Sequence, residues 1–291
     1  MEIEQKSLRI YFCVITSIII MFSLYVAGLK NMKDSNKNRD IYIYSDDGVS
    51  PESLSHTLSF FKKVASSSYK IKTLDAENLI TQKWQKNTAL LVMPGGADIP
   101  YTKKLNGLGN KIIKEYVSNG GKFLGICAGS YFGSNKIEFD KNGPLEVIGT
   151  RELAFFPGTA IGPVLGQFKY RSNYGAKAAD ITYKGKKLAV FYNGGPYFSL
   201  PTKDKNTDIL AYYDNKEQLL PAILKVKVGS GEVILSGVHF EYDASKLNKE
   251  NEFLKNIIPK LVTDDAKRLE LGEYILNSLG IASEVLEHMV A

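Results

Sequence analysis

The sequence predicts an α/β fold with a parallel sheet, preceded by one apolar segment long enough to cross a membrane. Two observations predict the sheet: short β-branched and aromatic runs alternate with stretches of helical spacing, and Gly, Asn or Asp turns separate them. The third observation is a single charge-free run near the N-terminus. The composition, 44% hydrophobic and 23% charged over 291 residues, excludes a collagen, a disulfide scaffold and a disordered chain.

The charge-free run covers residues 10–29 and is apolar on all sides. At about 1.5 Å per residue it matches one bilayer crossing, so we predict a transmembrane helix. A signal anchor is favoured over a signal peptide cleaved near Ala27, because the flank at residues 1–9 is not clearly positive. Residues 30–39 form a basic tether. The prediction is a single-pass membrane protein, with the side of the membrane left open.

The first half of the body is expected to alternate strand and helix. Ser50 followed by Pro51 is a helix start, because serine is a good N-cap and proline fits the first helical position. Asn119-Gly120-Gly121 is a helix stop. The expected elements are strands at 41–45, 69–74, 89–94 and 122–126, and helices at 51–64, from about 77, and at about 106–118.

The second half is richer in strands and ends in helices. Gly229-Ser230-Gly231 separates two apolar runs and predicts a hairpin. Strands are expected at about 181–193, 208–213, 222–228 and 232–238, and helices from about 245 to 261 and from 264 to 280. With no internal repeat, residues 40–291 are predicted to be one domain with insertions.

The charge and the cysteines restrict the classes of ligand. The net charge of +6 comes from lysines interspersed with acids, so no nucleic-acid partner is expected. The cysteines, Cys13 and Cys127, are too few for a zinc site, and no metal or other cofactor is predicted. No glycine pair has nucleotide-loop spacing. Cys13 lies in the apolar run, where it is expected to be a lipid-facing bystander.

The strongest local motif is Gly125-Ile126-Cys127-Ala128-Gly129, between a buried strand and a helical stretch. This is the thiol form of a nucleophile elbow, whose sharp turn needs small neighbours. The helix N-terminus favours the thiolate, and the N–H of Ala128 would face an oxyanion. The competing interpretation is a buried structural cysteine.

A nucleophilic thiol needs a base, and His239 is the best candidate. It follows the apolar run at 232–238, at the strand end where sheet-edge active sites lie. Glu241 could orient the imidazole and complete a Cys–His–Glu relay. The alternative is a histidine that only stabilises the strand end. Pro94-Gly95-Gly96 follows another strand and could supply a second oxyanion donor, although alone it is only a turn.

These blocks, in this order, resemble the biotin-protein ligase N-terminal-domain family within the class I glutamine amidotransferase-like superfamily. The similarity covers residues 40–282. It includes the helix pattern Arg268, Ile275, Leu276, Leu279 and Gly280. The other matching blocks are IYSDDGVS at 43–50, PGGADIPY at 94–101, LGICAGSYFGS at 124–134, FFPGTAIGP at 155–163 and YNGGPYF at 192–198.

The resemblance implies a flavodoxin-like three-layer sandwich with a mostly parallel central sheet. It implies Cys127 as nucleophile, His239 as acid–base group and Glu241 as orienting carboxylate. Gly95, Gly96 and Ala128 take the oxyanion positions, and the pocket positions are Asp98, Tyr101, Tyr131, Asn193, Gly194 and Gly195.

Departures from the family pattern limit the reaction that can be expected. The chain has His-Phe-Glu where superfamily glutaminases usually have His-Pro-Glu. It also has neither a synthase domain nor a biotin ligase catalytic domain, so biotin ligation is not expected. The leading expectation is a membrane-tethered cysteine hydrolase of amides or esters, with an unknown small-molecule or peptide substrate. The alternatives are a non-catalytic binding module of the same fold and a membrane scaffold for a partner protein.

Overall fold

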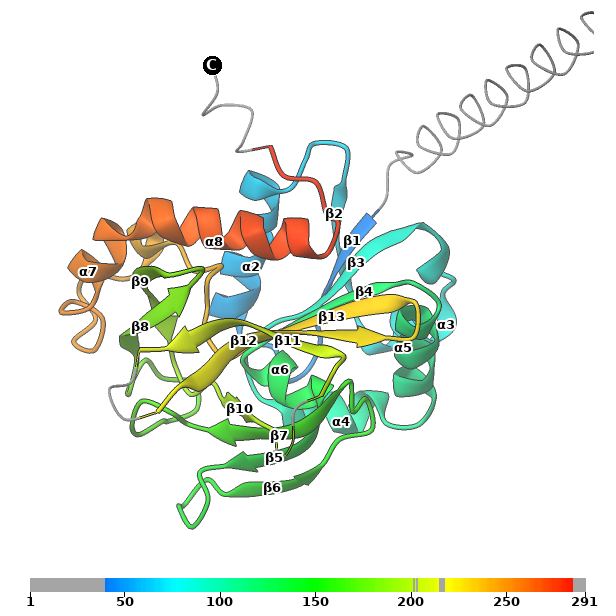
Figure 1. Ribbon diagram of the computed structural model, residues 1–291, viewed down its shortest axis with the longest axis horizontal. Helices are drawn as coiled ribbons and strands as arrows, with labels where there is room; N and C mark the ends of the chain where they lie inside the picture. The colour runs from blue at the N-terminus through cyan, green and yellow to red at the C-terminus, as the bar shows by residue number, and fades with distance from the viewer. Residues whose placement is uncertain (1–39, 201, 203, 215–217, 285–291) are drawn as a thin grey trace, which may run out of the picture. The chain divides into compact units, whose positions relative to one another are not determined.

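The computed structural model of the protein (Figure 1) describes residues 40–284, apart from 201, 203 and 215–217. The chain divides into two units, residues 1–39 and 40–291, and the first lies wholly outside the described residues. The described part contains a nine-stranded sheet with the order β2-β1-β3-β4-β13-β12-β11-β8-β9 and a separate four-stranded sheet.

One half of the large sheet is parallel, as the alternation of strand and helix predicted. β1 lies between β2 and β3, and β4 pairs with β3 and β13, all in parallel. α2 begins at the predicted cap, where Ser50 Oγ accepts the N–H of Ser53. The elements are β1 (Asp40–Tyr44), α2 (Pro51–Val64), β2 (Lys70–Leu74), α3 (Ala76–Thr81), η1 (Gln85–Asn87), β3 (Thr88–Met93), α4 (Asp98–Leu105), α5 (Leu108–Ser118), β4 (Lys122–Ile126) and α6 (Ala128–Gly133).

The prediction of a mostly parallel sheet is wrong for the other half. From β13 outward every pairing is antiparallel, and the connections from β8 to β9, from β11 to β12 and from β12 to β13 are too short for a crossover. The run predicted as one strand at 181–193 is a hairpin that turns at Lys184 and Gly185, both with positive φ. The elements are β8 (Lys177–Tyr183), β9 (Lys186–Tyr192), β11 (Thr207–Tyr213), β12 (Leu220–Val228) and β13 (Gly231–Ser236).

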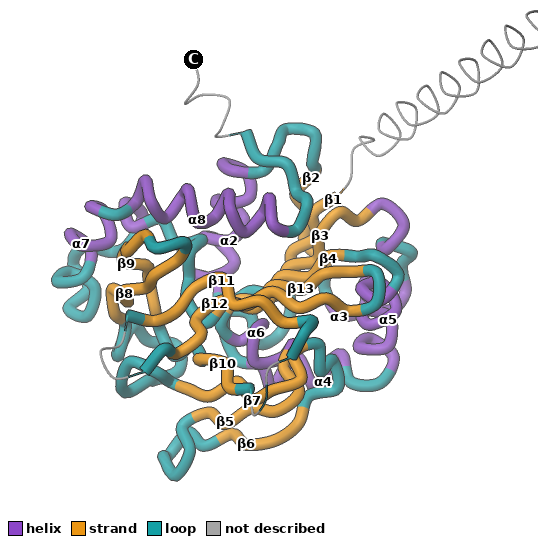
Figure 2. Tube along the Cα trace, in the orientation of Figure 1, coloured by secondary structure: helices purple, strands orange, loops and turns teal. Residues whose placement is uncertain are grey.

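Helices cover both faces of the parallel half (Figures 1 and 2). α2 packs with α8 (Asp265–Ser278), and α3 packs with α5. Alternate side chains of β3 enter different cores: Leu90 and Val92 join the α2/α8 cluster, while Leu91 and Met93 join the α3/α5 cluster. This alternation is why the strand is buried throughout.

The predicted helix at 245–261 is mostly turns. Asn248 accepts the N–H of Glu250, and Asn251 accepts the N–H of Phe253. These local side-chain bonds compete with helix formation. Only η2 (Ala244–Lys246) and α7 (Ile258–Thr263) are helical there.

The smaller sheet was not predicted as a unit. Its order is β10-β7-β5-β6, and α6 contacts strands of both sheets, which places the helix between them (Figure 2). The strands are β5 (Ser134–Phe139), β6 (Val147–Thr150), β7 (Phe156–Gly162) and β10 (Tyr197–Ser199). Phe139 in β5 and Val147 in β6 line a small cavity beside Cys127.

The membrane prediction needs correction. In the described part of the chain, no helix is both long and apolar enough to span a bilayer. The longest of those helices, α2 and α8, have 14 residues, whereas a crossing needs about 20. The segment at residues 10–29 lies outside the described residues, so neither the predicted transmembrane helix nor single-pass membrane localisation is supported, and both are withdrawn.

Candidate active site

Cys127 occupies a sharp turn between β4 and α6. Its backbone has φ 50° and ψ −104°, a left-handed conformation that non-glycine residues rarely adopt. A β-carbon on Gly129 would overlap the carbonyl oxygen of Met93, and one on Gly125 would overlap that of Gly129. The motif therefore needs small residues on both sides of Cys127, as a nucleophile elbow does.

The sheet order explains how distant residues meet. β3, β4 and β13 are parallel neighbours, so their carboxyl ends lie at one edge of the sheet. Gly95 follows β3, Cys127 follows β4 and His239 follows β13. A β-carbon built on Gly95 would lie 2.7 Å from Cε1 of His239 and 3.5 Å from Cβ of Cys127. The thiol and the imidazole therefore both lie against Gly95.

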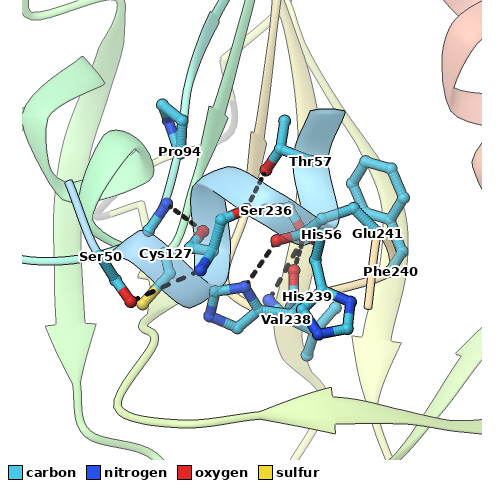
Figure 3. A network of polar contacts seen from close by, with 12 residues as sticks. Ser50, His56, Thr57, Pro94, Cys127, Ser236, Val238, His239, Phe240 and Glu241 are labelled. Carbon is cyan, nitrogen blue, oxygen red and sulfur yellow. Dashed lines mark hydrogen bonds and ion pairs between the residues drawn. The ribbon is translucent and has the colours of Figure 1, made fainter. Parts of the chain in front are cut away.

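His239 is held on the other side by Glu241. Its Nδ1 lies 2.7 Å from Oε1 of Glu241, and the two residues are 3% and 1% exposed (Figure 3). Its backbone N–H donates to the carbonyl oxygen of Phe191 in β9. β9 is the outer strand of the large sheet, so the antiparallel half curls back to this edge.

Phe240, which lies between His239 and Glu241 in the sequence, is held in place by α8. Arg268 Nη1 donates to the carbonyl oxygen of Phe240 at 2.8 Å, and its other nitrogens contact Asp265. The ring of Phe240 packs edge-on against Phe60 of α2. These contacts hold Phe240 between α8 and α2.

The electrostatics favour a charged imidazole. Burial would lower the pKa of His239, but the Glu241 carboxylate and the contact with Cys127 outweigh it and raise the pKa to about 10. An imidazolium beside a thiol stabilises the thiolate, which is the nucleophilic form. In the geometry described, Cys127 Sγ lies 3.6 Å from the carbonyl oxygen of Asn193, to which the thiol can donate.

An aromatic stack lies behind His239. The ring of Tyr242 stacks on His56 at 4.1 Å and on Phe191 at 4.3 Å, and it meets His239 edge-on at 4.7 Å. Burial lowers the pKa of His56, which accepts the N–H of Asp243. His56 is thus a neutral histidine that supports the stack.

The three predicted oxyanion positions are not equivalent. The N–H of Gly95 donates to Ser53 Oγ at 2.9 Å, so it is occupied. Gly96 and Ala128 both line the small cavity beside Cys127, and no hydrogen bond to another described residue engages their N–H groups. These two N–H groups are the available donors.

Of the predicted pocket residues, some line the cavity and others do not. Asp98, Tyr131 and Gly194 line the cavity with Cys127. The hydroxyl of Tyr101 is turned to the carbonyl oxygen of Pro94. Asn193 Nδ2 donates to the carbonyl oxygen of Ser172, while Gly195 lies so close to Gly237 that a β-carbon would overlap its carbonyl oxygen. Tyr101, Asn193 and Gly195 are not among the described residues that line the cavity.

Sequence reasoning missed an aromatic wall and a buried ion pair. Phe139 comes from β5, and Phe168 and Tyr170 come from the loop between β7 and β8; all three line the cavity. Arg151 Nε pairs with Asp98 at 2.6 Å. A loop has no periodicity that would place a side chain, and only the PGGAD block marked Asp98 in advance. In the described part of the chain, no three His, Cys, Asp or Glu residues are grouped to hold a metal.

Comparisons with known proteins place this chain in a family. The family model described as "Biotin-protein ligase, N terminal" matches residues 39–289. The chain is 36% identical to a biotin–protein ligase of Schizosaccharomyces pombe over 249 residues, which are 83% of this chain but 38% of that enzyme. It is also 36% identical to an uncharacterized protein of Chlamydia muridarum over 257 residues, 86% of this chain and 98% of that protein.

Similarity to solved structures is weak. Gan42B, a GH42 β-galactosidase, matches with a TM-score of 0.47 and 12% identity over 84% of this chain and 30% of that one. A ThuA-like protein from Bacteroides uniformis matches with a TM-score of 0.42 and 12% identity over 80% of this chain and 91% of that one. No functional argument rests on either.

Proposed function

The chain belongs to the biotin-protein ligase N-terminal family, and we propose that it is a cysteine-dependent hydrolase of amides or esters. The observation that carries the proposal is the elbow thiol of Cys127, which lies with a buried His239–Glu241 pair at one sheet edge. Because the chain spans only 38% of the S. pombe ligase, ligation is not transferred to it.

The first half of the reaction forms a thioester. With the thiol proton already held on His239, the Cys127 sulfur attacks the substrate carbonyl carbon. The N–H groups of Gly96 and Ala128 stabilise the oxyanion. The carbonyl re-forms as the C–N or C–O bond breaks, and imidazolium gives its proton to the leaving amine or alcohol.

The second half consumes water. In the thioester the sulfur carries no charge, which removes one of the contributions that raise the pKa of His239. The imidazole can then accept a proton from water as the water oxygen attacks the thioester carbon. The C–S bond breaks, the acid leaves and the thiol is restored. Glu241 holds Nδ1 throughout and thereby fixes which ring nitrogen faces the sulfur.

Hydrolysis of p-nitrophenyl acetate tests this proposal. Its acyl group is small, and release of p-nitrophenol is followed directly. Cys127→Ala is expected to fall to the uncatalysed rate, whereas the matched variant Cys13→Ser is expected to keep the parent rate. Equal rates for Cys127→Ala and the parent would overturn the proposal.

A second candidate is a non-catalytic binding module. One observation favours it: Cys127 Sγ is within hydrogen-bond distance of the carbonyl oxygen of Asn193, and only a neutral thiol can donate there. This candidate predicts no acetate hydrolysis above background, together with thermal stabilisation by a ligand that Cys127→Ala still binds.

A further inference from the structure

The cavity beside Cys127 has a chemistry of its own. Building on the proposed function, we infer that the site selects a neutral acyl group with a flat apolar substituent and rejects zwitterionic amino acids such as free glutamine. Three features carry this inference: the pairing of the cavity's charges, the aromatic rings at its mouth and its small volume.

No free charge is offered to a ligand. Among the described residues that line the cavity, Asp98 is the one carboxylate and none is a lysine, arginine or histidine; Oδ2 of Asp98 lies 2.6 Å from Nε of Arg151. The two side chains are 10% and 6% exposed. His239 and Glu241 form a second buried pair, and neither of them is among the described residues that line the cavity. A zwitterion would therefore lose water from an ammonium and a carboxylate without gaining a partner for either.

Arg151 Nη2 is buried and has no hydrogen-bond partner among the described residues. Arg151 itself is absent from the cavity lining, whereas its partner Asp98 belongs to it. Because a ligand carboxylate could compete with Asp98 for this guanidinium, an anionic probe belongs in the test.

The mouth is aromatic. Phe168 packs edge-on against Tyr170 at 4.9 Å and against Phe139 at 5.5 Å. Gly194 lets Phe168 approach, because a β-carbon there would overlap the ring. Tyr170 is 38% exposed, so part of its ring remains free to contact a ligand. Burial, with the charges of Asp98 and Cys127, raises its pKa to about 12, so the phenol stays neutral.

The cavity is so small that only part of the substrate can enter it. The enclosed space is about 20 Å³, room for one water-sized group. A carbonyl oxygen fits there, next to the N–H groups of Gly96 and Ala128. The remainder of the acyl group must lie at the mouth, where Tyr170, Phe168 and Val147 present apolar surface. A flat ring suits that surface because aromatic pairs gain from edge-to-face and offset contacts.

The test uses chloromethyl ketones in the full chain with Cys13→Ser as background. All share the reactive group; they differ in carrying a phenyl ring, a carboxylate, or an amino acid's ammonium and carboxylate at the same distance. The Cys127 sulfur displaces chloride, so an S–C bond forms as the C–Cl bond breaks. Mass spectrometry gives the rates. The phenyl probe is expected to react at least about tenfold faster than either charged probe.

Two variants and the unsubstituted reagent iodoacetamide show whether the preference for the phenyl probe depends on the ring that lines the cavity. Tyr170→Ala is expected to lower the phenyl preference at least about threefold. The matched control is Tyr174→Ala, which is equally exposed on the same loop but packs on Phe253 and does not line the cavity. It should keep the preference. Iodoacetamide, which lacks a substituent, should react equally with both variants.

Contrary outcomes separate this inference from the proposed function. A zwitterionic or carboxylate probe that matches or exceeds the phenyl probe overturns the inference, whatever the acetate assay gives. Acetate hydrolysis that survives in Cys127→Ala overturns the proposed function, whereas the alkylation ratio does not depend on hydrolysis. Equal loss of preference in Tyr170→Ala and Tyr174→Ala would also overturn the inference, because the loop rather than the cavity ring would set it.

Discussion

Replacing Glu241 with glutamine removes a charge from the site while nearly preserving the side chain's shape. Glu241 Oε1 lies 2.7 Å from Nδ1 of His239, and both side chains are buried. The rise in the pKa of His239 from 6.5 to about 10 corresponds to about 5 kcal/mol in favour of the imidazolium. Glu241 makes the largest contribution that raises it. Just under half of that free energy, about 2 kcal/mol, is roughly a 30-fold change in an equilibrium constant.

The assay is the rate of Cys127 alkylation by iodoacetamide between pH 5 and 9, in a Cys13→Ser background. Glu241→Gln is expected to react roughly 10- to 30-fold more slowly at pH 7, because a less favoured imidazolium gives less support to the thiolate. The matched control is Glu52→Gln, a half-buried carboxylate that feels the charge of His239 without a hydrogen bond to it. It should stay within about threefold of the parent. An unchanged rate and pH profile in Glu241→Gln would refute the reasoning.

Three further predictions follow from the same geometry. Because the pKa of His239 is raised in the folded protein, the stability that this residue contributes is complete below about pH 6.5 and is lost as the pH rises towards about 10. Denaturant unfolding across this window should show a decline in the free energy of unfolding of up to about 5 kcal/mol. The decline should be smaller in Glu241→Gln. Gly129→Ala should cost at least about 3 kcal/mol, roughly 6–12 °C in melting temperature, since its β-carbon overlaps a main-chain carbonyl oxygen. Gly149→Ala, whose β-carbon has only an ordinary 3.5 Å contact, should melt within about 2 °C of the parent, and an equal loss in both would contradict the elbow argument. Arg268→Ala leaves the carbonyl oxygen of Phe240 without its donor, so alkylation of Cys127 should slow and its dependence on pH should change. Arg268→Lys should recover part of the rate. A lower melting temperature with an unchanged pH dependence would mean that the arginine has a purely structural role.

The carboxyl ends of the parallel strands were predictable because they depend on local pattern. Cys127 and His239 each follow an apolar run and a turn, which the sequence displays directly. Their adjacency was expected from the chemistry of a Cys–His–Glu relay and from the family resemblance, but not from local pattern, since β13 pairs with β4 across about a hundred residues of chain. Hydrophobic pattern predicts that a strand exists, while its neighbours are decided by packing of the whole sheet.

Other features had no sequence signal. Ser53 lies in a helix whose spacing was clear, but its bond to the N–H of Gly95 depends on how α2 docks at the sheet edge. Phe168 and Tyr170 belong to an irregular loop, where neighbouring residues follow no period. The mixed sheet was not predicted, because short apolar runs indicate that strands exist but not whether neighbouring strands pair in parallel or antiparallel.

The mass of the intact chain during turnover tests the central claim most directly. With a neutral p-nitrophenyl ester, quenched within the first turnovers, the account predicts a mass gain equal to the acyl group. Peptide mapping should place it on Cys127, and neutral hydroxylamine should remove it by cleaving the thioester. A chain that releases p-nitrophenol without acylation of Cys127, or that carries the same adduct in Cys127→Ala, would contradict the account.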